Sequence, residues 1–383
     1  MKSVVMKNIK LLFFSLVVIV LSDCSSTKPD QGSQGAPTDR DQRFGPPQRG
    51  GNGPGQGPGG PGAGGASRNN PEADNQGGNT FFINLDGSDC NVDIEAKLGV
   101  SSVYTEIIDE KNQLRKITIN SIADHQVGEF PNPGNPNTIK VSKGTFNIPL
   151  NPKVATKTTS AQGFDSGVLF SGVSIDPFTA EMFIGSTGQM NPRYNITTLT
   201  STENLGLDCN NAHVQPTGKY HYHGTPSALV DDEGIDGSEM VKIGYASDGF
   251  PIYYKYGYNS EGELVEHQSG YKLKEGDRGG DGVTAPDGPH NGRYFSDYKY
   301  DQNLSELDAC NGRWGKTPES ANEYYYVVTD NFPSVPLCFS GTPNNELRKG
   351  GGRNGGQRPQ RGAGGPPPRR GGNHDETEPI NKL

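Results

Sequence analysis

Residues 209–223 read Cys-Asn-Asn-Ala-His-Val-Gln-Pro-Thr-Gly-Lys-Tyr-His-Tyr-His. The final alternation of tyrosine and histidine predicts a β-strand, because successive side chains of a strand point to opposite faces of a sheet. The two tyrosines then share one face, and His221 and His223 lie side by side on the other. His213, in the preceding loop, can fold back towards them as a third imidazole.

These three histidines predict a metal site, because three neutral imidazoles suit Zn²⁺ or Cu²⁺ and leave a coordination position open. His125, His290 and Asp248 are additional candidates, as a fourth ligand, as a group that orients a ligand, or as a general base. The alternative for the trio is a hydrogen-bonded tyrosine–histidine strand that stabilises a polar core. The alternative for the other three is an ordinary position in a loop or turn.

A partial copy of this segment follows downstream. Residues 207–223 align with residues 307–327 through shared leucine, aspartate, asparagine and alternating tyrosines. The histidines do not recur, and Arg313, Tyr325 and Val327 take their places. The two less polar replacements indicate that the histidine-bearing face points inward, where each imidazole needs a metal or a hydrogen-bond partner.

Short β-rich runs surround both segments. Residues 102–109 and 114–122, separated by a polar turn, predict a hairpin. Further runs of this kind cover residues 167–175, 182–184, 219–223, 242–246, 251–256, 270–273, 293–300 and 324–328. Because no stretch shows a long apolar period of 3.6 residues, we expect a mainly β domain, sandwich-like or barrel-like, with long loops.

Composition limits how much of the chain can fold. Among 383 residues there are 54 glycines and 29 prolines, which crowd into residues 31–78 and 349–372. Such stretches bury too little apolar surface to offset the entropy of ordering them. We therefore expect one β-rich domain over residues 79–345, between a disordered tether (24–78) and a disordered basic Gly/Arg/Pro tail (346–383).

The N-terminus predicts export. Residues 1–23 read as a signal segment, in which three lysines precede an apolar run, residues 11–21, that is too short for a permanent membrane span. Cys24 follows directly, as in the lipobox of bacterial lipoproteins, although Asp23 replaces the usual small residue. We expect lipid on Cys24 to anchor the protein to a membrane of the cell envelope. The alternatives are ordinary secretion to the extracellular space or an uncleaved anchor.

Cysteine usage agrees with an oxidising compartment. If Cys24 carries lipid, four cysteines remain, which allow three pairings. We favour Cys310 with Cys338, which closes a short loop, and Cys90 with Cys209; free buried thiols are the alternative. No pair has the C-x-x-C spacing typical of a zinc knuckle.

Charge and motifs narrow the partners and reactions. The net charge is −9, yet the tail is basic, and its Gly/Arg/Pro repeats are typical of RNA-binding segments in cytoplasmic proteins. An exported protein meets no RNA, so we expect no nucleic-acid partner and a solvated linker that contacts anionic lipid or polysaccharide. The chain contains no G-x-S-x-G elbow, Walker loop, H-E-x-x-H motif or dinucleotide fingerprint.

The Tyr-His-Tyr-His string resembles the signature of the bacterial YHYH-domain family. Other blocks that resemble this family cover residues 122–137, 171–181, 248–253, 310–313 and 324–330. Together they span roughly residues 115–340, with Ala212 where the family has glycine. The resemblance implies an exported protein and, because the family has no established activity, gives no reaction.

Two function classes follow. The first is an exported, lipid-anchored YHYH-domain protein that binds a metal or another ligand through its histidine cluster. The second is a metal-dependent enzyme, a hydrolase or a copper oxidase, that uses the same cluster. We favour the first because Asp248 is the sole candidate carboxylate for activating a bound water. The sequence does not identify a protein or polysaccharide partner.

Overall fold

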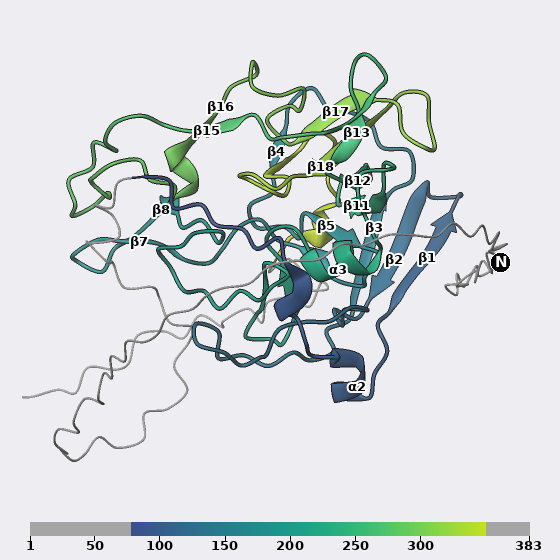
Figure 1. Cartoon of the computed structure of the whole chain (residues 1–383), viewed down its shortest axis with the longest axis horizontal. Helices are drawn as coiled ribbons and strands as arrows, with labels where there is room; N and C mark the ends of the chain where they lie inside the picture. Colours follow the sequence, from purple (N-terminus) through teal and green to yellow (C-terminus); the bar gives the residue numbers. More distant parts are fainter. Residues whose placement is uncertain (1–77, 350–383) are drawn as a thin grey trace, which may run out of the picture. The chain divides into compact units, whose positions relative to one another are not determined.

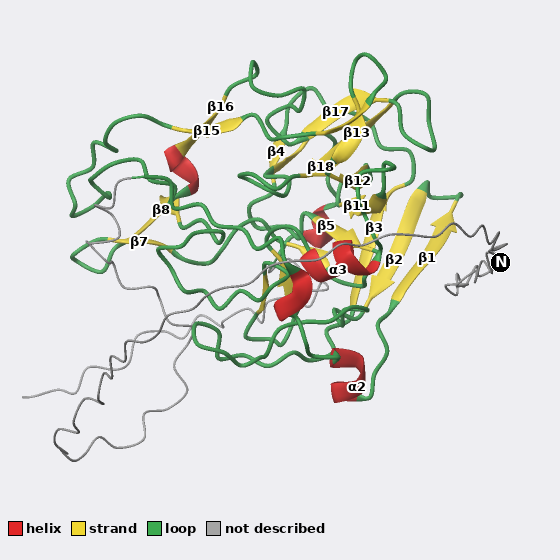
Figure 2. Ribbon diagram, viewed as in Figure 1, coloured by secondary structure: helices red, strands yellow, loops and turns green. Residues whose placement is uncertain are grey.

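The computed structural model describes residues 78–349 (Figure 1). The predicted signal segment, Cys24, nearly all of the predicted tether and the tail from residue 350 onward lie outside the described residues. Within the described part, strands are short and long loops join them, with few helical turns (Figure 2). The prediction of a mainly β domain with long loops is confirmed.

An eight-stranded sheet forms the centre of the domain, and its strands follow the order β17-β18-β12-β11-β5-β6-β10-β9. Their bounds are β17 Gly312–Gly315, β18 Glu323–Val328, β12 Pro251–Tyr254, β11 Lys242–Ala246, β5 Gly167–Leu169, β6 Ser174–Ile175, β10 Tyr220–Tyr222 and β9 Ala212–Val214. Two pairs of neighbours are parallel, β10 with β6 and β12 with β18, and the other pairs are antiparallel.

A three-stranded antiparallel sheet lies beside it, at the right of Figure 1. Its strands are β1 (Tyr104–Asp109), β2 (Leu114–Ile119) and β3 (Gly144–Pro149), so the predicted hairpin is confirmed. Ile117 and Ile148 share a buried cluster with Val168 of β5. A buried apolar cluster thus joins the two sheets, and no sheet within residues 78–349 closes into a barrel.

The remaining elements are short. Four two-stranded ribbons join β13 (Tyr256–Tyr258) to β14 (Leu264–Glu266), β15 (Tyr271–Leu273) to β16 (Tyr298–Tyr300), β19 (Cys338–Phe339) to β4 (Thr159–Ser160), and β7 (Met182–Ile184) to β8 (Met190–Asn195). The helical turns are η1 (Gly87–Asp89), α2 (Ile94–Leu98), α3 (Ser227–Asp232), η2 (Phe295–Asp297) and η3 (Asn345–Leu347). Within residues 78–349, no helix has the length and apolar character needed to cross a bilayer.

The large sheet is internally duplicated. The β5–β6 and β11–β12 hairpins are equivalent, and so are the β9–β10 and β17–β18 hairpins at the two ends. Because β5 and β11 are antiparallel neighbours at the centre, an approximate two-fold axis between them relates the halves. The predicted repeat is therefore confirmed as a repeat in three dimensions.

Matching hydrogen bonds lock the two end hairpins. The Tyr220 hydroxyl donates to Asp208 Oδ2 at 2.6 Å, and the Tyr324 hydroxyl donates to Asp308 Oδ2 at 2.7 Å. Each aspartate also accepts backbone N–H groups of the turn that leads into its hairpin. The tyrosine–aspartate pair thus belongs to the scaffold, as the recurrence of these residues in the sequence indicates.

Two disulfides join Cys90 to Cys209 and Cys310 to Cys338, with Cα–Cα distances of 5.6 and 4.9 Å. The favoured pairing is confirmed. Cys209 lies just before β9 and Cys310 just before β17, so each end of the large sheet carries its own cross-link.

Three local expectations differ from the structure. Residues 167–175 form a hairpin rather than one strand, because Gly172 turns the chain with a φ of +79°. Residues 293–300 are not one strand, because the helical turn η2 (Phe295–Asp297) precedes β16 within them. Lys349, assigned to the tail from the sequence, forms an ion pair with Asp176 on the domain.

Candidate metal centre

The hairpin β9–β10 at one end of the large sheet positions the histidines. In its antiparallel register His221 lies directly opposite His213. Gly218, with a φ of +91°, closes the turn between the strands, a conformation that glycine adopts without strain. The strand and the loop histidine predicted from the sequence are therefore two paired strands, and His213 belongs to the first of them.

His223 lies one residue beyond β10 and continues the pairing. Its backbone N–H donates to the Asn211 carbonyl at 2.8 Å. Asn211 has a φ of +52°, and its side-chain amide donates to the carbonyls of Asn84 and Thr225. This buried asparagine therefore fixes the chain on both sides of the hairpin.

The three imidazoles converge. Their ring centroids are 4.7 to 4.8 Å apart in each pairing, and one ring nitrogen from each lies within 4.8 Å of the other two. The Nε2 atoms of His213 and His223 are 3.1 Å apart. We call His213, His221 and His223 the histidine triad.

Each Nδ1 atom of the triad has a partner behind the ring. His213 Nδ1 lies 2.9 Å from the Leu205 carbonyl, and His221 Nδ1 lies 3.3 Å from the Lys219 carbonyl. Because a carbonyl only accepts, we assign the proton of these two rings to Nδ1, which leaves Nε2 as the lone-pair atom. His223 Nδ1 lies 3.2 Å from the Thr198 hydroxyl, which can accept or donate.

Burial keeps the triad neutral. His221 and His223 are each only 2% exposed, and desolvation lowers the pKa of both well below the usual value. The neighbouring imidazoles lower the pKa of His221 and His223 further, because a positive charge on one ring disfavours protonation of the next. Burial also lowers the pKa of His213. Neutral imidazole is the form that binds metals.

The residues fit a metal ion. At 3.1 Å the contact between the two Nε2 atoms holds one of two things. It is a hydrogen bond donated by His223 Nε2–H if the Thr198 hydroxyl donates to His223 Nδ1, or it holds a metal ion if both Nε2 atoms carry lone pairs. Two imidazole nitrogens bound to one tetrahedral Zn²⁺ at 2.0 to 2.1 Å are about 3.3 Å apart. The observed separation is close to that value, and Nδ1–H groups that donate to carbonyls are the usual support of metal-binding histidines.

The other candidate residues lie elsewhere. His125 Nε2 lies 2.6 Å from the Tyr222 hydroxyl, which places His125 on the tyrosine face of β10, away from the triad. His290 Nδ1 donates to the Gly276 carbonyl in a loop. Neither belongs to the set of converging ligands found among the described residues. Both residues are distant from the triad in sequence, so only the fold of the whole domain decides where they lie.

Asp248 is also separate from the triad. It is fully buried in the turn between β11 and β12, where its Oδ2 accepts from the Tyr326 hydroxyl at 2.6 Å and from the Gly341 N–H at 2.8 Å. Burial raises the pKa of this carboxyl to about 6. Asp248 therefore supports the second half of the sheet and does not bind with the triad.

The structure brings a different carboxylate near the site. Glu181, just before β7, raises the pKa of His213 through its negative charge, against the larger lowering by burial. In the sequence, Glu181 stands out only as part of the block 171–181 that resembles the YHYH family. No spacing signal connects it to His213, because the two residues are brought together by the fold.

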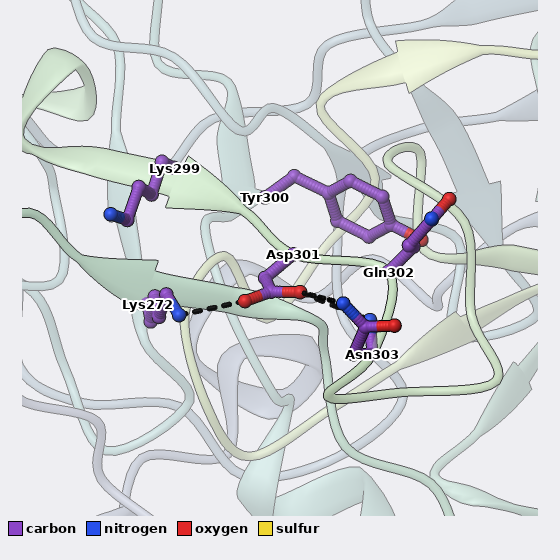
Figure 3. Close-up of a pocket in the computed structure, with 6 residues that line it drawn as sticks. All are labelled: Lys272, Lys299, Tyr300, Asp301, Gln302 and Asn303. Atoms are coloured by element: carbon purple, nitrogen blue, oxygen red, sulfur yellow. Dashed lines mark hydrogen bonds and ion pairs between the residues drawn. The ribbon is translucent and has the colours of Figure 1, made fainter.

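A separate surface hollow lies beside the β15–β16 ribbon (Figure 3). It measures about 420 Å³, and in it Lys272 pairs with Asp301 at 2.7 Å while the Asn303 side chain donates to the same carboxylate. None of its lining residues belongs to the triad.

Comparison with known proteins assigns the domain. A family model described as YHYH protein matches residues 145–341, which contain the triad, Glu181 and Asp248. Searches of curated proteins and of solved structures found no match.

Proposed function

Since the chain belongs to the YHYH protein family, we propose that it is a metal-binding module that holds one Zn²⁺ or Cu²⁺ ion between His213, His221 and His223. One observation carries this proposal: three neutral, buried imidazoles converge with their Nδ1 atoms already occupied behind the rings. The chemistry that the ion supplies there is Lewis acidity, or electron transfer if the ion is copper.

We further propose that the module acts in the cell envelope, anchored by lipid on Cys24. The basic, apolar N-terminal segment and the cysteine that follows it support this assignment. The two disulfides among the four remaining cysteines are typical of an oxidising compartment. The glycine- and proline-rich stretch after Cys24 would hold the domain away from the membrane.

Binding is favoured over catalysis by the surroundings of the triad. The cavity beside His223 measures about 10 Å³, which is room for one water molecule and too little for an organic substrate. The carboxylate that could activate such a water is Glu181, and this residue is the one observation that favours the alternative, a metal-dependent hydrolase. Hydrolysis by the metal-loaded protein that disappears in Glu181→Gln, with the metal retained, would favour the enzyme.

Metal content tests the proposal. We expect the purified full-length protein, incubated with Zn²⁺ or Cu²⁺ and freed of excess ion, to retain one ion per chain by elemental analysis. The double variant His221→Ala plus His223→Ala should retain less than a tenth of that amount, because one imidazole alone gives weak binding.

His290→Ala is the matched control, because it removes a histidine that lies outside the triad. Its metal content should equal that of the wild type. Wild-type protein without stoichiometric metal, or equal retention by the double variant, would show that the short imidazole contact holds a proton instead.

A further inference from the structure

The opposite end of the large sheet carries a second polar cluster at the positions that correspond to the triad. Arg313 pairs with Tyr325 across β17 and β18, just as His213 pairs with His221 across β9 and β10. His267, which follows β14, adds an imidazole, with its Nε2 3.0 Å from Arg313 Nη1. The three histidines of the triad do not recur at this end of the sheet, and Arg313, Tyr325 and Val327 stand in their places.

Only one side of the Arg313 guanidinium is occupied. Its Nη1 donates both to His267 Nε2 and to Glu306 Oε2, the latter at 2.5 Å, so both hydrogens of Nη1 are used. Among residues 78–349 no acceptor contacts Nε, and this atom is buried. The edge formed by Nε and Nη2 is one of the two edges through which arginine binds a carboxylate with parallel hydrogen bonds.

Tyr325 provides a second free donor. The residue is fully buried, and its hydroxyl has no hydrogen-bond partner in the described part of the chain. A buried hydroxyl without a partner is costly and rare in native proteins, so a ligand is the natural explanation. In the first half of the sheet, the position that corresponds to Tyr325 by register is occupied by His221, a member of the triad.

Two glycines keep side chains away from these donors. A Cβ atom at Gly257 would lie 3.0 Å from the Tyr325 hydroxyl and 2.9 Å from His267 Nε2. A Cβ atom at Gly315 would lie 3.4 Å from the same hydroxyl and 3.7 Å from Arg313 Nε. The hydroxyl and the free edge of the guanidinium therefore meet at one place, and the short distances limit a ligand there to a few atoms.

The charges favour an anion of moderate size. Burial, followed by the positive charge of Arg313, lowers the pKa of His267 to about 4, so His267 is neutral at pH 7 and accepts from Arg313. Glu306 is 41% exposed and lies towards solvent, where screening weakens its repulsion of a second carboxylate. The buried donors, in contrast, act at low dielectric.

We propose that Arg313 and Tyr325 form a binding site for a small carboxylate, of the size of formate or acetate, held by the Nε–Nη2 edge of Arg313 and by the Tyr325 hydroxyl. The site is independent of the metal centre, because it lies at the other end of the sheet and shares no residue with the triad. Through the duplication, one hairpin scaffold would carry a cation site at one end and an anion site at the other.

Thermal unfolding of the full-length protein tests this proposal. Sodium formate and sodium acetate, titrated against sodium chloride at constant ionic strength, should raise the wild-type melting temperature in a saturable way. Tyr325→Phe should weaken the apparent affinity at least about tenfold, because it removes one hydrogen bond to a charged ligand. Arg313→Lys should abolish the response, because lysine lacks the two-pronged edge.

Tyr325→Phe also guards against a folding artefact. It removes only a hydroxyl that has no partner within the described residues, so without carboxylate its melting temperature should equal or exceed that of the wild type. Tyr324→Phe, one residue earlier and on the opposite face, should keep the wild-type affinity for formate. A wild type that responds to carboxylate no more than to chloride, or equal affinities of wild type and Tyr325→Phe, would overturn the proposal.

Discussion

Asp248 is a buried acid whose surroundings change its pKa. Asp248 is fully buried, and its second oxygen, Oδ1, has no partner among residues 78–349. Ser171 occupies the corresponding place in the first half, where its hydroxyl lies 2.9 Å from that of Tyr222. Only the second half of the sheet therefore carries an ionisable group at this position. Burial raises the pKa of the Asp248 carboxyl to about 6.

The Asp248 carboxyl should titrate near pH 6, about two units above an exposed aspartate. Because its folded-state pKa lies above the unfolded value, its contribution to the free energy of unfolding is fully present below pH 4. That contribution is lost as the pH rises through about 6, and two units correspond to about 3 kcal/mol. Carbon-13 NMR of the carboxyl group gives the pKa, and urea unfolding between pH 4 and 7 gives the stability.

In Asp248→Asn, the free energy of unfolding should no longer show the part of its pH dependence that comes from this carboxyl. Asp236→Asn is the matched control, because Asp236 is exposed and hydrogen bonds to Ser238 lower its pKa. A midpoint near 4 for Asp248, or the same profile with and without its carboxyl, would contradict the assignment.

The convergence of the triad could be predicted from the sequence, because its residues are close in the chain and a strand alternates its side chains between two faces. His213, His221 and His223 lie within eleven residues, and period-two alternation put two of them on one face. The faces of His125 and Asp248 depend on how distant strands pair, which no local pattern encodes. Whether the three residues bind a metal remains a prediction.

In the large sheet, the two end hairpins carry the edge strands β9 and β17, each of which has a neighbouring strand on one side only. Each is preceded by a half-cystine. The sequence separations differ, 119 residues for Cys90–Cys209 and 28 for Cys310–Cys338. A cross-link that closes a longer loop removes more entropy from the unfolded chain.

Removing the Cys90–Cys209 disulfide should therefore lower the free energy of unfolding more than removing Cys310–Cys338. The chain-entropy relation gives a loss of about 5 kcal/mol in the free energy of unfolding for Cys90→Ser plus Cys209→Ser, and about 4 kcal/mol for Cys310→Ser plus Cys338→Ser. Urea unfolding of the two double variants beside the wild type measures both, and each variant is the control for the other. A larger loss from the shorter loop would mean that native packing around the cystines outweighs loop entropy.

At this scale the sequence revealed which segments are strands better than how they pair. The hairpin β1–β2 and most β-rich runs could be recognised because β-branched and aromatic residues cluster between turns. The strands outside the predicted runs are β3, β4, β8, β9, β14, β17, β19 and all but the first residue of β13. β3 begins with a glycine and ends with a proline, residues that are depleted in strands, and β9 is recognisable only through its partner β10. Pairing across long loops depends on burial in the whole domain.

For the whole molecule, the junction between β5 and β11 is decisive, because it joins the two halves of the sheet. Gly244 lies at this junction, and a Cβ atom there would overlap the Val168 carbonyl oxygen and lie 2.9 Å from the Leu169 Cα atom. Both obstacles are backbone atoms, which cannot move aside as a flexible side chain can.

Gly244→Ala should lower the free energy of unfolding by about 3 kcal/mol, at the upper end of the usual cost of overpacking. Gly144→Ala in β3 is the control, since its Cβ atom would meet side chains at ordinary distances of 3.4 and 3.7 Å, and the loss there should stay below about 1 kcal/mol. Urea unfolding followed by circular dichroism compares them. Equal stability of the two variants would show that the halves can shift apart without cost.

The fold class and the repeat were accessible from the sequence because composition, turn residues and recurring tyrosines are local properties. The palindromic strand order was not, because it arises from two hairpins meeting at a centre that neither encodes alone. The predicted tether and tail lie almost wholly outside the described residues and remain predictions.

The duplication has an evolutionary consequence. Each end of the sheet has its own cystine and its own tyrosine–aspartate lock, so mutations at one end need not be compensated at the other. Three positions in each end hairpin correspond to one another: those of the triad at one end, and those of Arg313, Tyr325 and Val327 at the other. Relatives of this chain could therefore lose a binding site, exchange its ligand, or carry the same site at both ends by changing these positions while the rest of the hairpin stays intact. Those three positions in each half are where divergence among such relatives should be read first.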